Sequence, residues 1–275
     1  MDYFTAIILG LVQGLTEFLP VSSSAHLSIV GRLIGQEDPG AAFTAITQLG
    51  TEAAVLVYFW KDIWRIIKHW SLALVGKMPR NDPDARLGWL VIVGSIPIGV
   101  LGLLFQDDIE TGLRSLWITA TMLLVFSFVI LAAEKVGRQT KVMRELTWRD
   151  GIIYGLFQAL ALVPGVSRSG GTIAGGMFMG YTRAAAARYS FLLAIPAVLA
   201  SGGLQLWKSM NETTAIPVAW GPLWVATILS FFVALAVIAW FMRFISRNSF
   251  TPFVIYRIIL ALVLFALLGF GVIPA

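Results

Sequence analysis

The sequence contains no cysteine and few charged residues. The absence of cysteine excludes disulfide bonds and metal sites with thiolate ligands. Only 13% of the 275 residues are Asp, Glu, Lys or Arg, whereas soluble domains average about 25%. Because 58% of the residues are hydrophobic, a soluble domain of this size would have more apolar surface than its core could bury. These shortages exclude an ordinary soluble protein and indicate an integral membrane protein.

Long apolar runs dominate what is present. The hydrocarbon core of a bilayer is roughly 30 Å thick, and a helix needs about 20 apolar residues to cross it. The runs that meet this length cover residues 41–60, 87–106, 113–133, 184–207, 223–243 and 253–273. We therefore predict an all-α integral membrane protein with six transmembrane helices, folded as a single membrane domain over residues 1–275.

Two further apolar segments are interrupted by proline and polar residues. Residues 3–35 contain Pro20 and a run of three serines, and residues 151–180 contain Pro164-Gly165 followed by a polar cluster. Each continuous piece is too short to cross a bilayer comfortably. Irregular backbone at membrane depth is tolerated where it lines a cavity in the protein. We expect two re-entrant helix–loop–helix elements, each entering and leaving the membrane on one side.

The basic residues are distributed unevenly between the predicted spans. They are scattered rather than clustered in one patch, so the net charge of +5 does not indicate a nucleic-acid partner. Cytoplasmic loops of membrane proteins are enriched in Lys and Arg. Alternating the six spans places fifteen basic residues on one side, eleven of them in the loops 61–86 and 134–150. That side is predicted to be cytoplasmic, so the first interrupted segment opens to the outside, the second opens to the cytoplasm, and the C-terminus lies outside.

The two interrupted segments resemble each other at an offset of 145 residues. The matching positions include polar residues and glycines in register: Gly10 and Gly155, Gln13 and Gln158, Ser22 and Ser167, Ser24 and Ser169, Gly31 and Gly176. Three predicted spans separate the segments, and an odd number makes the two halves face opposite ways. We predict an inverted-topology repeat, with repeat 1 at about 1–140 and repeat 2 at about 146–275. Transporters with such repeats have their working site near the midplane, between the repeats.

The first interruption carries a carboxylate, hydroxyls and an imidazole. Gln13 and Glu17 are four residues apart and share one helical face. A carboxylate such as Glu17 within an apolar segment costs a few kcal/mol on insertion scales unless it has a partner or faces water. If the next helix begins near Ser22, then Ser22 and Ser23 share the face of His26. This set can activate a nucleophile, although capping serines and a buried structural histidine would give the same pattern.

The second interruption is typical of an anion site. It contains Arg168, whose planar guanidinium suits phosphate, and it immediately precedes a predicted helix, whose first N–H groups favour an anion. Arg168 could alternatively form a structural pair with Glu17. The neighbouring hydroxyls and the first glycine are Ser167, Ser169, Gly170 and Thr172. Brought together between the repeats, the two interruptions would surround one phosphate, which indicates phosphate-group chemistry or transport within the membrane.

Two stretches carry a specific resemblance to a known family. Residues 13–26, Gln-Gly-Leu-Thr-Glu-Phe-Leu-Pro-Val-Ser-Ser-Ser-Ala-His, and residues 164–172 resemble the bacterial undecaprenyl-diphosphate phosphatases, the bacitracin-resistance family. Both signatures of that family are present, Glu/Gln-x-x-x-Glu and Pro-Gly-x-Ser-Arg-Ser-x-x-Thr. The resemblance implies hydrolysis of undecaprenyl diphosphate to the monophosphate carrier lipid of cell-wall synthesis. It also implies a divalent cation, Mg²⁺ or Ca²⁺, that bridges the diphosphate, and a site opening to the outer face of the bacterial cytoplasmic membrane.

The same resemblance implies roles for individual residues. The implied catalytic residues are Glu17, Ser23, His26 and Arg168. The implied substrate contacts are Gln13, Ser22, Ser24, Ser167, Ser169, Gly170 and Thr172. Glu17 is also the implied metal ligand. Because Gln13 stands where many relatives have glutamate, Glu17 must take more of that role.

Other assignments stay open at this level. The nucleophile is Ser23, His26 or water. Glu52, within the first predicted span, either lines the cavity or lies near the outer end in contact with solvent. Arg257 is expected to extend toward the cytoplasmic surface along its aliphatic stem. A non-hydrolytic transporter or flippase of a phosphorylated prenyl lipid is the alternative function, the expected partners are undecaprenyl diphosphate and membrane lipids, and a homodimer is compatible with the sequence.

Overall fold

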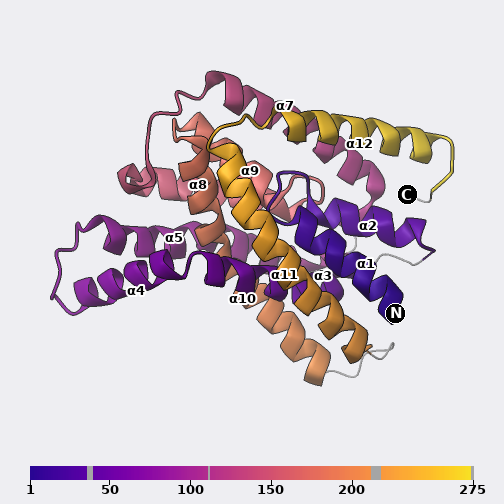
Figure 1. Ribbon diagram of the computed structural model, residues 1–275, viewed down its shortest axis with the longest axis horizontal. Coiled ribbons are helices and arrows are strands. Elements are labelled where there is room, and N and C mark those ends of the chain that lie inside the picture. Colours follow the sequence, from indigo (N-terminus) through magenta and orange to yellow (C-terminus); the bar gives the residue numbers. More distant parts are fainter. Residues whose placement is uncertain (36–39, 111, 212–217, 274–275) are drawn as a thin grey trace.

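Helices make up the regular structure of residues 1–35, 40–110, 112–211 and 218–273, the part of the chain described by the computed structural model (Figure 1). Five helices are long and apolar enough to cross a membrane, and the number rises to six if the bent pair α3 and α4 is counted as one span. No strand occurs among these residues apart from a single isolated bridge. The prediction of an all-α integral membrane protein is confirmed.

Helices lie at all six positions predicted for membrane spans. Their bounds are α3 Gly40–Tyr58, α5 Pro83–Leu104, α7 Leu116–Val136, α10 Arg183–Asn211, α11 Trp220–Ile245 and α12 Thr251–Gly269. The short elements between them are α6 Gln106–Glu110 and the 3-10 turns η1 Gly112–Arg114 and η2 Met143–Glu145. The ends of the long helices agree with the apolar runs because apolar length is what the bilayer selects.

Helix α4, Trp60–Leu74, occupies much of the region predicted to be the loop 61–86. It follows α3 after a bend of 78° and packs beside α5 (Figure 1). Apolar Trp64 and Ile67 and basic Lys61 are all exposed on it. An amphipathic helix that exposes both basic and aromatic side chains is typical of a membrane surface. The sequence interpretation was wrong to leave this segment as a loop, because surface helices and cytoplasmic loops are equally rich in Lys and Arg.

Both interrupted segments fold as helix–break–helix elements, as predicted. The first consists of α1 (Tyr3–Thr16) and α2 (Ser23–Leu33). The second consists of α8 (Trp148–Ala159), the 3-10 turn η3 (Leu160–Leu162) and α9 (Arg168–Phe178). None of the four α-helices exceeds 14 residues. None is therefore long enough to cross a bilayer alone, and the breaks must be stabilised by the surrounding helices.

Each interrupted element packs against a long helix from the other half of the chain. Helix α1 contacts α11 most extensively, α8 contacts α5, and α7 lies beside α12 (Figure 1). Glycine makes these approaches possible. A Cβ added to Gly10 would lie 2.7 Å from the Ala226 oxygen, and one added to Gly155 would lie 2.6 Å from the Gly94 oxygen. This exchange of partners brings the two breaks together in the middle of the molecule.

Arg257 of α12 fixes the two breaks to each other. Its side chain is fully buried. Its guanidinium donates to the Pro20 carbonyl at 3.0 Å and to the Gly165 carbonyl at 2.9 Å, equivalent positions in the two breaks, and to Ser127 Oγ at 3.3 Å. The expectation that Arg257 extends to the membrane surface is wrong. The breaks leave backbone carbonyls without helical partners in the interior. These carbonyls accept the hydrogen bonds that a buried guanidinium would otherwise make with water.

Candidate active site

The two breaks have the same backbone turn. Ser22 and Ser167, 145 residues apart, both adopt a positive φ, 72° and 71°. Each caps the following helix, since Ser22 Oγ accepts from the Ala25 N–H at 3.4 Å and Ser167 Oγ from the Gly170 N–H at 3.1 Å. The residue after each cap, Ser23 or Arg168, is the first of its helix. Both side chains therefore start beside the positive end of a helix, where an anion is stabilised.

Glu17 is the centre of a cluster that draws on both breaks. Its Oε2 accepts from Gln13 Nε2 at 2.8 Å and from Ser23 Oγ at 2.7 Å. Its Oε1 accepts from Arg168 Nη2 at 2.5 Å, which is also an ion pair. The sequence predicted that the interruptions converge, and the structure places Gln13, Glu17, Ser23 and Arg168 in contact.

The cluster is partly open. The side chain of Glu17 is 3% exposed and that of Arg168 is 17% exposed. Among the described hydrogen bonds, only Nη2 of the Arg168 guanidinium has a partner. The remaining N–H groups of the guanidinium can therefore bind a planar pair of phosphate oxygens without further rearrangement. Ser23 is half-buried beside the same pair, so its hydroxyl can approach a phosphate held there.

His26 is hydrogen-bonded to a serine carbonyl and a tyrosine rather than to a serine hydroxyl. Its Nδ1 lies 2.7 Å from the Ser22 carbonyl, and its Nε2 lies 2.7 Å from the Tyr256 hydroxyl. The carbonyl can only accept, so Nδ1 carries the proton and Nε2 accepts from Tyr256. The Tyr256 ring stacks on the imidazole at 5.6 Å. No hydrogen bond joins His26 to Ser23 within the described part of the chain, so the predicted hydroxyl–imidazole pair does not form.

Tyr256 was missed by the sequence reasoning. It lies on α12, 230 residues from His26, among exposed apolar side chains such as Ile255 and Ile259. An aromatic residue at such a position is indistinguishable by sequence from one that faces lipid. Its adjacency to Arg257 was the only available signal, because an arginine within a span marks a polar interior.

The other predicted contacts support the turns. Ser22 and Ser24 hydroxyls lie 3.2 Å apart, and those of Ser167 and Ser169 lie 3.1 Å apart. Ser169 also donates to the Leu19 carbonyl at 3.0 Å, which ties the second break to the first. Thr172 is fully buried, donates to the Arg168 carbonyl at 2.7 Å and contacts Ser190. A Cβ added to Gly170 would meet Ser167 at 3.2 Å, so glycine keeps this turn tight.

Glu52 of α3 belongs to the interior rather than to the outer end of its helix. It is 1% exposed, and its Oε1 has no hydrogen-bond partner among the described residues. The charges of both Arg168 and Glu17 act on it. Gln13 Oε1 is likewise buried without a partner. Carboxylate and amide oxygens are the ligands that Mg²⁺ and Ca²⁺ prefer, so these residues fit the divalent cation that the family resemblance implies.

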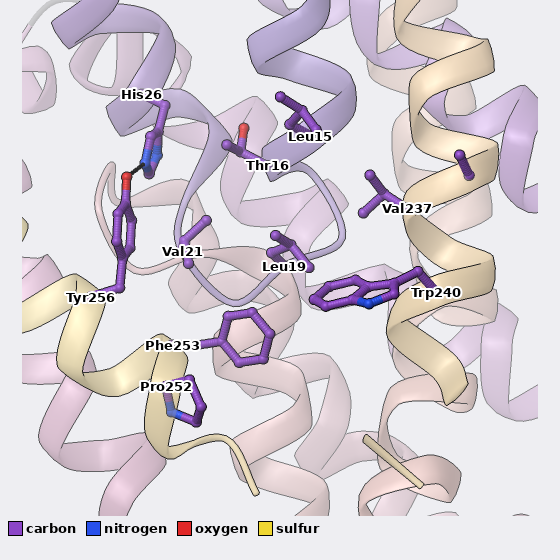
Figure 2. A pocket seen from close by; sticks show the side chains of 11 residues that line it. Leu15, Thr16, Leu19, Val21, His26, Val237, Trp240, Pro252, Phe253 and Tyr256 are labelled. Carbon is purple, nitrogen blue, oxygen red and sulfur yellow. Dashed lines mark hydrogen bonds between the residues drawn. The ribbon is translucent and has the colours of Figure 1, made fainter. Parts of the chain in front are cut away.

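An apolar groove of about 620 Å³ is lined by residues of the first break on both sides of Glu17 in the sequence (Figure 2). In Figure 2, His26 and Tyr256 face each other on one side, and Val237 and Trp240 of α11 lie on the other. The remaining lining residues are Leu15, Thr16, Leu19, Val21, Ala236, Pro252 and Phe253. His26 is the predicted site residue that also lines this groove. The arrangement suits a molecule with a charged head and a long apolar chain.

A second group compatible with a divalent cation lies in the hairpin between α4 and α5. His69, Asp82 and Asp84 offer ligand atoms within 4.8 Å of one another. His69 Nδ1 is 2.9 Å from Asp82, and Arg65 Nε is 2.9 Å from Asp84. Burial raises the pKa of Asp82, but hydrogen bonds from the Ala85 N–H and from His69 outweigh it and hold the pKa below its usual value. The sequence reasoning did not single out this group, since its residue spacing matches no familiar metal motif.

The chain is similar to one protein family and to several of its members along nearly its whole length. A model of the family described as bacitracin resistance protein BacA matches residues 6–263. The undecaprenyl-diphosphatase of Micrococcus luteus is 65% identical over the whole of both chains. That of Renibacterium salmoninarum is 61% identical over 100% of this chain and 99% of its own. The undecaprenyl-diphosphatase 2 of Streptomyces coelicolor is 60% identical over 99% of this chain and 97% of its own.

Proposed function

The chain belongs to the bacitracin resistance protein BacA family, and we propose that it is a membrane phosphatase that hydrolyses undecaprenyl diphosphate to undecaprenyl monophosphate and phosphate. The observation that carries this function is the ion pair between Glu17 and Arg168, which joins the two breaks in one phosphate-binding cluster. The full-length relatives named undecaprenyl-diphosphatases support the substrate. The product is the carrier lipid of bacterial cell-wall synthesis.

The substrate binds with its head at the cluster and its chain in the groove. Arg168 and the N–H groups at the starts of α2 and α9 hold the terminal phosphate. His26 lines the groove, so it is placed to contact the phosphate nearer the lipid. The isoprene units next to the head then pack against Trp240 and Phe253, and the rest of the chain extends into the bilayer.

Ser23 is the nucleophile in this proposal. Its hydroxyl already donates to Glu17 at 2.7 Å, so Glu17 can take the proton as Ser23 Oγ attacks the terminal phosphorus. The bond from that phosphorus to the bridging oxygen breaks, and undecaprenyl monophosphate leaves. Water then hydrolyses the phosphoserine and releases phosphate. Arg168 stabilises the charge on the transferred group.

A divalent cation, when bound by Glu17 and the Gln13 amide oxygen, would neutralise charge on the diphosphate oxygens. Gln13 also orients Glu17, because its Nε2 holds Oε2 in place. The structure has no hydrogen bond to Gln13 Oε1 within the described residues, which leaves that oxygen available.

The two halves, about 1–140 and 146–275, form an inverted repeat in this proposal. The matched φ values at Ser22 and Ser167, the matched glycine contacts at Gly10 and Gly155, and the shared binding of Arg257 to both turns support it. The asymmetric distribution of Lys and Arg supports a site that opens to the outer face of the cytoplasmic membrane.

Phosphate release by the purified protein in detergent tests the function. With undecaprenyl diphosphate or a shorter prenyl diphosphate and Mg²⁺, we expect continuous release of inorganic phosphate. Hydrolysis does not need a sealed bilayer, whereas transport does. A well-folded preparation that binds the lipid but releases no phosphate would overturn the proposal and favour a transporter.

A further inference from the structure

Glu52 is a buried carboxylate for which the reaction described above has no use. It lies on α3, outside both breaks, and is 1% exposed. Its Oε1 makes no hydrogen bond with any described residue. A buried carboxylate without a partner is costly, and proteins retain one where a charge or a ligand completes it.

The charges that act on Glu52 are those of the active site. They are the guanidinium of Arg168 and the carboxylate of Glu17. If Glu52 is ionised, it and Glu17 together carry one more negative charge than Arg168 balances, and a diphosphate adds several more. Repulsion between buried like charges must then be relieved by a cation or by a proton. A divalent cation relieves it for the protein and for the substrate together.

The oxygen atoms on offer suit such a cation. Glu17 provides a carboxylate, and Glu52 Oε1 and Gln13 Oε1 are buried oxygens without partners. Mg²⁺ is usually held by one or two carboxylates together with substrate phosphates. Position 13 offers a neutral amide oxygen, so Glu17 is the carboxylate that the first break contributes.

We propose that Glu52 is the second carboxylate of a divalent-cation site shared with Glu17, in which Gln13 contributes a neutral amide oxygen. The inference rests on the proposed function, since the cation serves the bound diphosphate. It makes α3 a third contributor to the site, beside the two breaks.

Binding of Mn²⁺ to the purified protein, followed by the electron paramagnetic resonance of free Mn²⁺, tests this site without reference to turnover. We expect Glu52→Gln to weaken Mn²⁺ binding by at least about tenfold, as loss of a supporting group does at other metal sites. The double variant Gln13→Glu/Glu52→Gln moves the carboxylate to α1 and should recover most of the affinity. The Mg²⁺ concentration needed for phosphate release should shift in the same order.

His69→Gln is the matched control, because it removes the other group compatible with a cation. It should leave both the Mn²⁺ affinity and the Mg²⁺ requirement unchanged. Wild-type Mn²⁺ affinity in Glu52→Gln, or loss of binding in His69→Gln instead, would overturn the inference. If Glu52→Gln fails to fold, Glu52→Asp is measured instead. It keeps the carboxylate but withdraws it by one methylene, and an unchanged Mn²⁺ affinity in that variant would also overturn the inference. Failure of the wild type to release phosphate would count against the proposed function alone, since Mn²⁺ binding is measured separately.

Discussion

At the scale of single residues, Glu17 makes three contacts that have different consequences. Gln13 orients it, Ser23 gives it a proton to accept, and Arg168 balances its charge. An ion pair this buried is a poor source of net stability, because desolvation offsets much of the attraction. In this proposal the ion pair has a catalytic role. A bound phosphate competes with Glu17 for the Arg168 guanidinium, and Glu17 can then accept the proton of Ser23.

Substitution of Arg168 separates its charge from its geometry. Arg168→Lys keeps the charge but loses the planar fork, so we expect it to lose most activity, and Arg168→Ala should lose about 10²–10³ in rate. Phosphate release at matched expression and melting temperature measures both. The exposed Arg138→Ala is the control and should behave as wild type. Near-normal turnover by Arg168→Ala would rule out a phosphate-binding role.

Substitution of Ser23 tests the nucleophile. Ser23→Ala should abolish turnover, and rapid quenching of the wild type with a substrate labelled in its terminal phosphate should trap a phosphoserine at this position. Ser201→Ala, which removes an exposed hydroxyl on α10, should leave the rate unchanged. A label found on His26, or full activity of Ser23→Ala, would show that attack comes from the imidazole or from water.

At the scale of elements, the two turns depend on α12 as much as on their own sequences. Proline, glycine and serine end one helix and start the next, but they leave carbonyl groups in the interior without helical partners. Arg257 donates a hydrogen bond to one such carbonyl in each turn. The shape of the active site therefore depends on α12 as well as on the two breaks.

Removal of the Arg257 guanidinium should loosen both turns. In Arg257→Met the Pro20 and Gly165 carbonyls lose their donor, and each buried group left unpaired costs about 1–3 kcal/mol. We expect a clear fall in melting temperature together with loss of activity. Arg243→Met, at an exposed site on α11, should change neither. An unchanged melting temperature in Arg257→Met would mean that the turns hold their shape without it.

At the scale of the whole molecule, hydropathy and charge predicted most of the architecture. The spans and both breaks follow from apolar length and from Pro20 and Pro164, which are local properties. The meeting of Glu17 with Arg168 was predicted from the resemblance between the two interrupted segments. The pairing of His26 with Tyr256 and the burial of Arg257 could not be predicted, because they depend on how α12 packs against segments more than 90 residues away.

Accessibility of introduced cysteines tests the orientation of the repeat. The native chain has no cysteine, so single cysteines at Ser71, Gln139 and Ala275 can be probed in intact cells with a membrane-impermeant thiol reagent. Ala275 lies outside the described residues. Only the cysteine at Ala275 should be labelled, because Ser71 on α4 and Gln139 after α7 both lie on the predicted cytoplasmic side. Labelling at Gln139, or protection at Ala275, would contradict both the inverted repeat and an outward-facing site.

The central claim is that two breaks, one from each half of the chain, form a single hydrolytic site. Phosphate release by the wild type, Glu17→Gln, Arg168→Ala and the double variant measures this most directly. We expect each single variant to lose about 10²–10³ in rate. The double variant should lose little more than the worse of the two, since groups that act as a unit are non-additive. Losses that multiply in the double variant, or full activity in either single variant, would show that the two breaks do not act together.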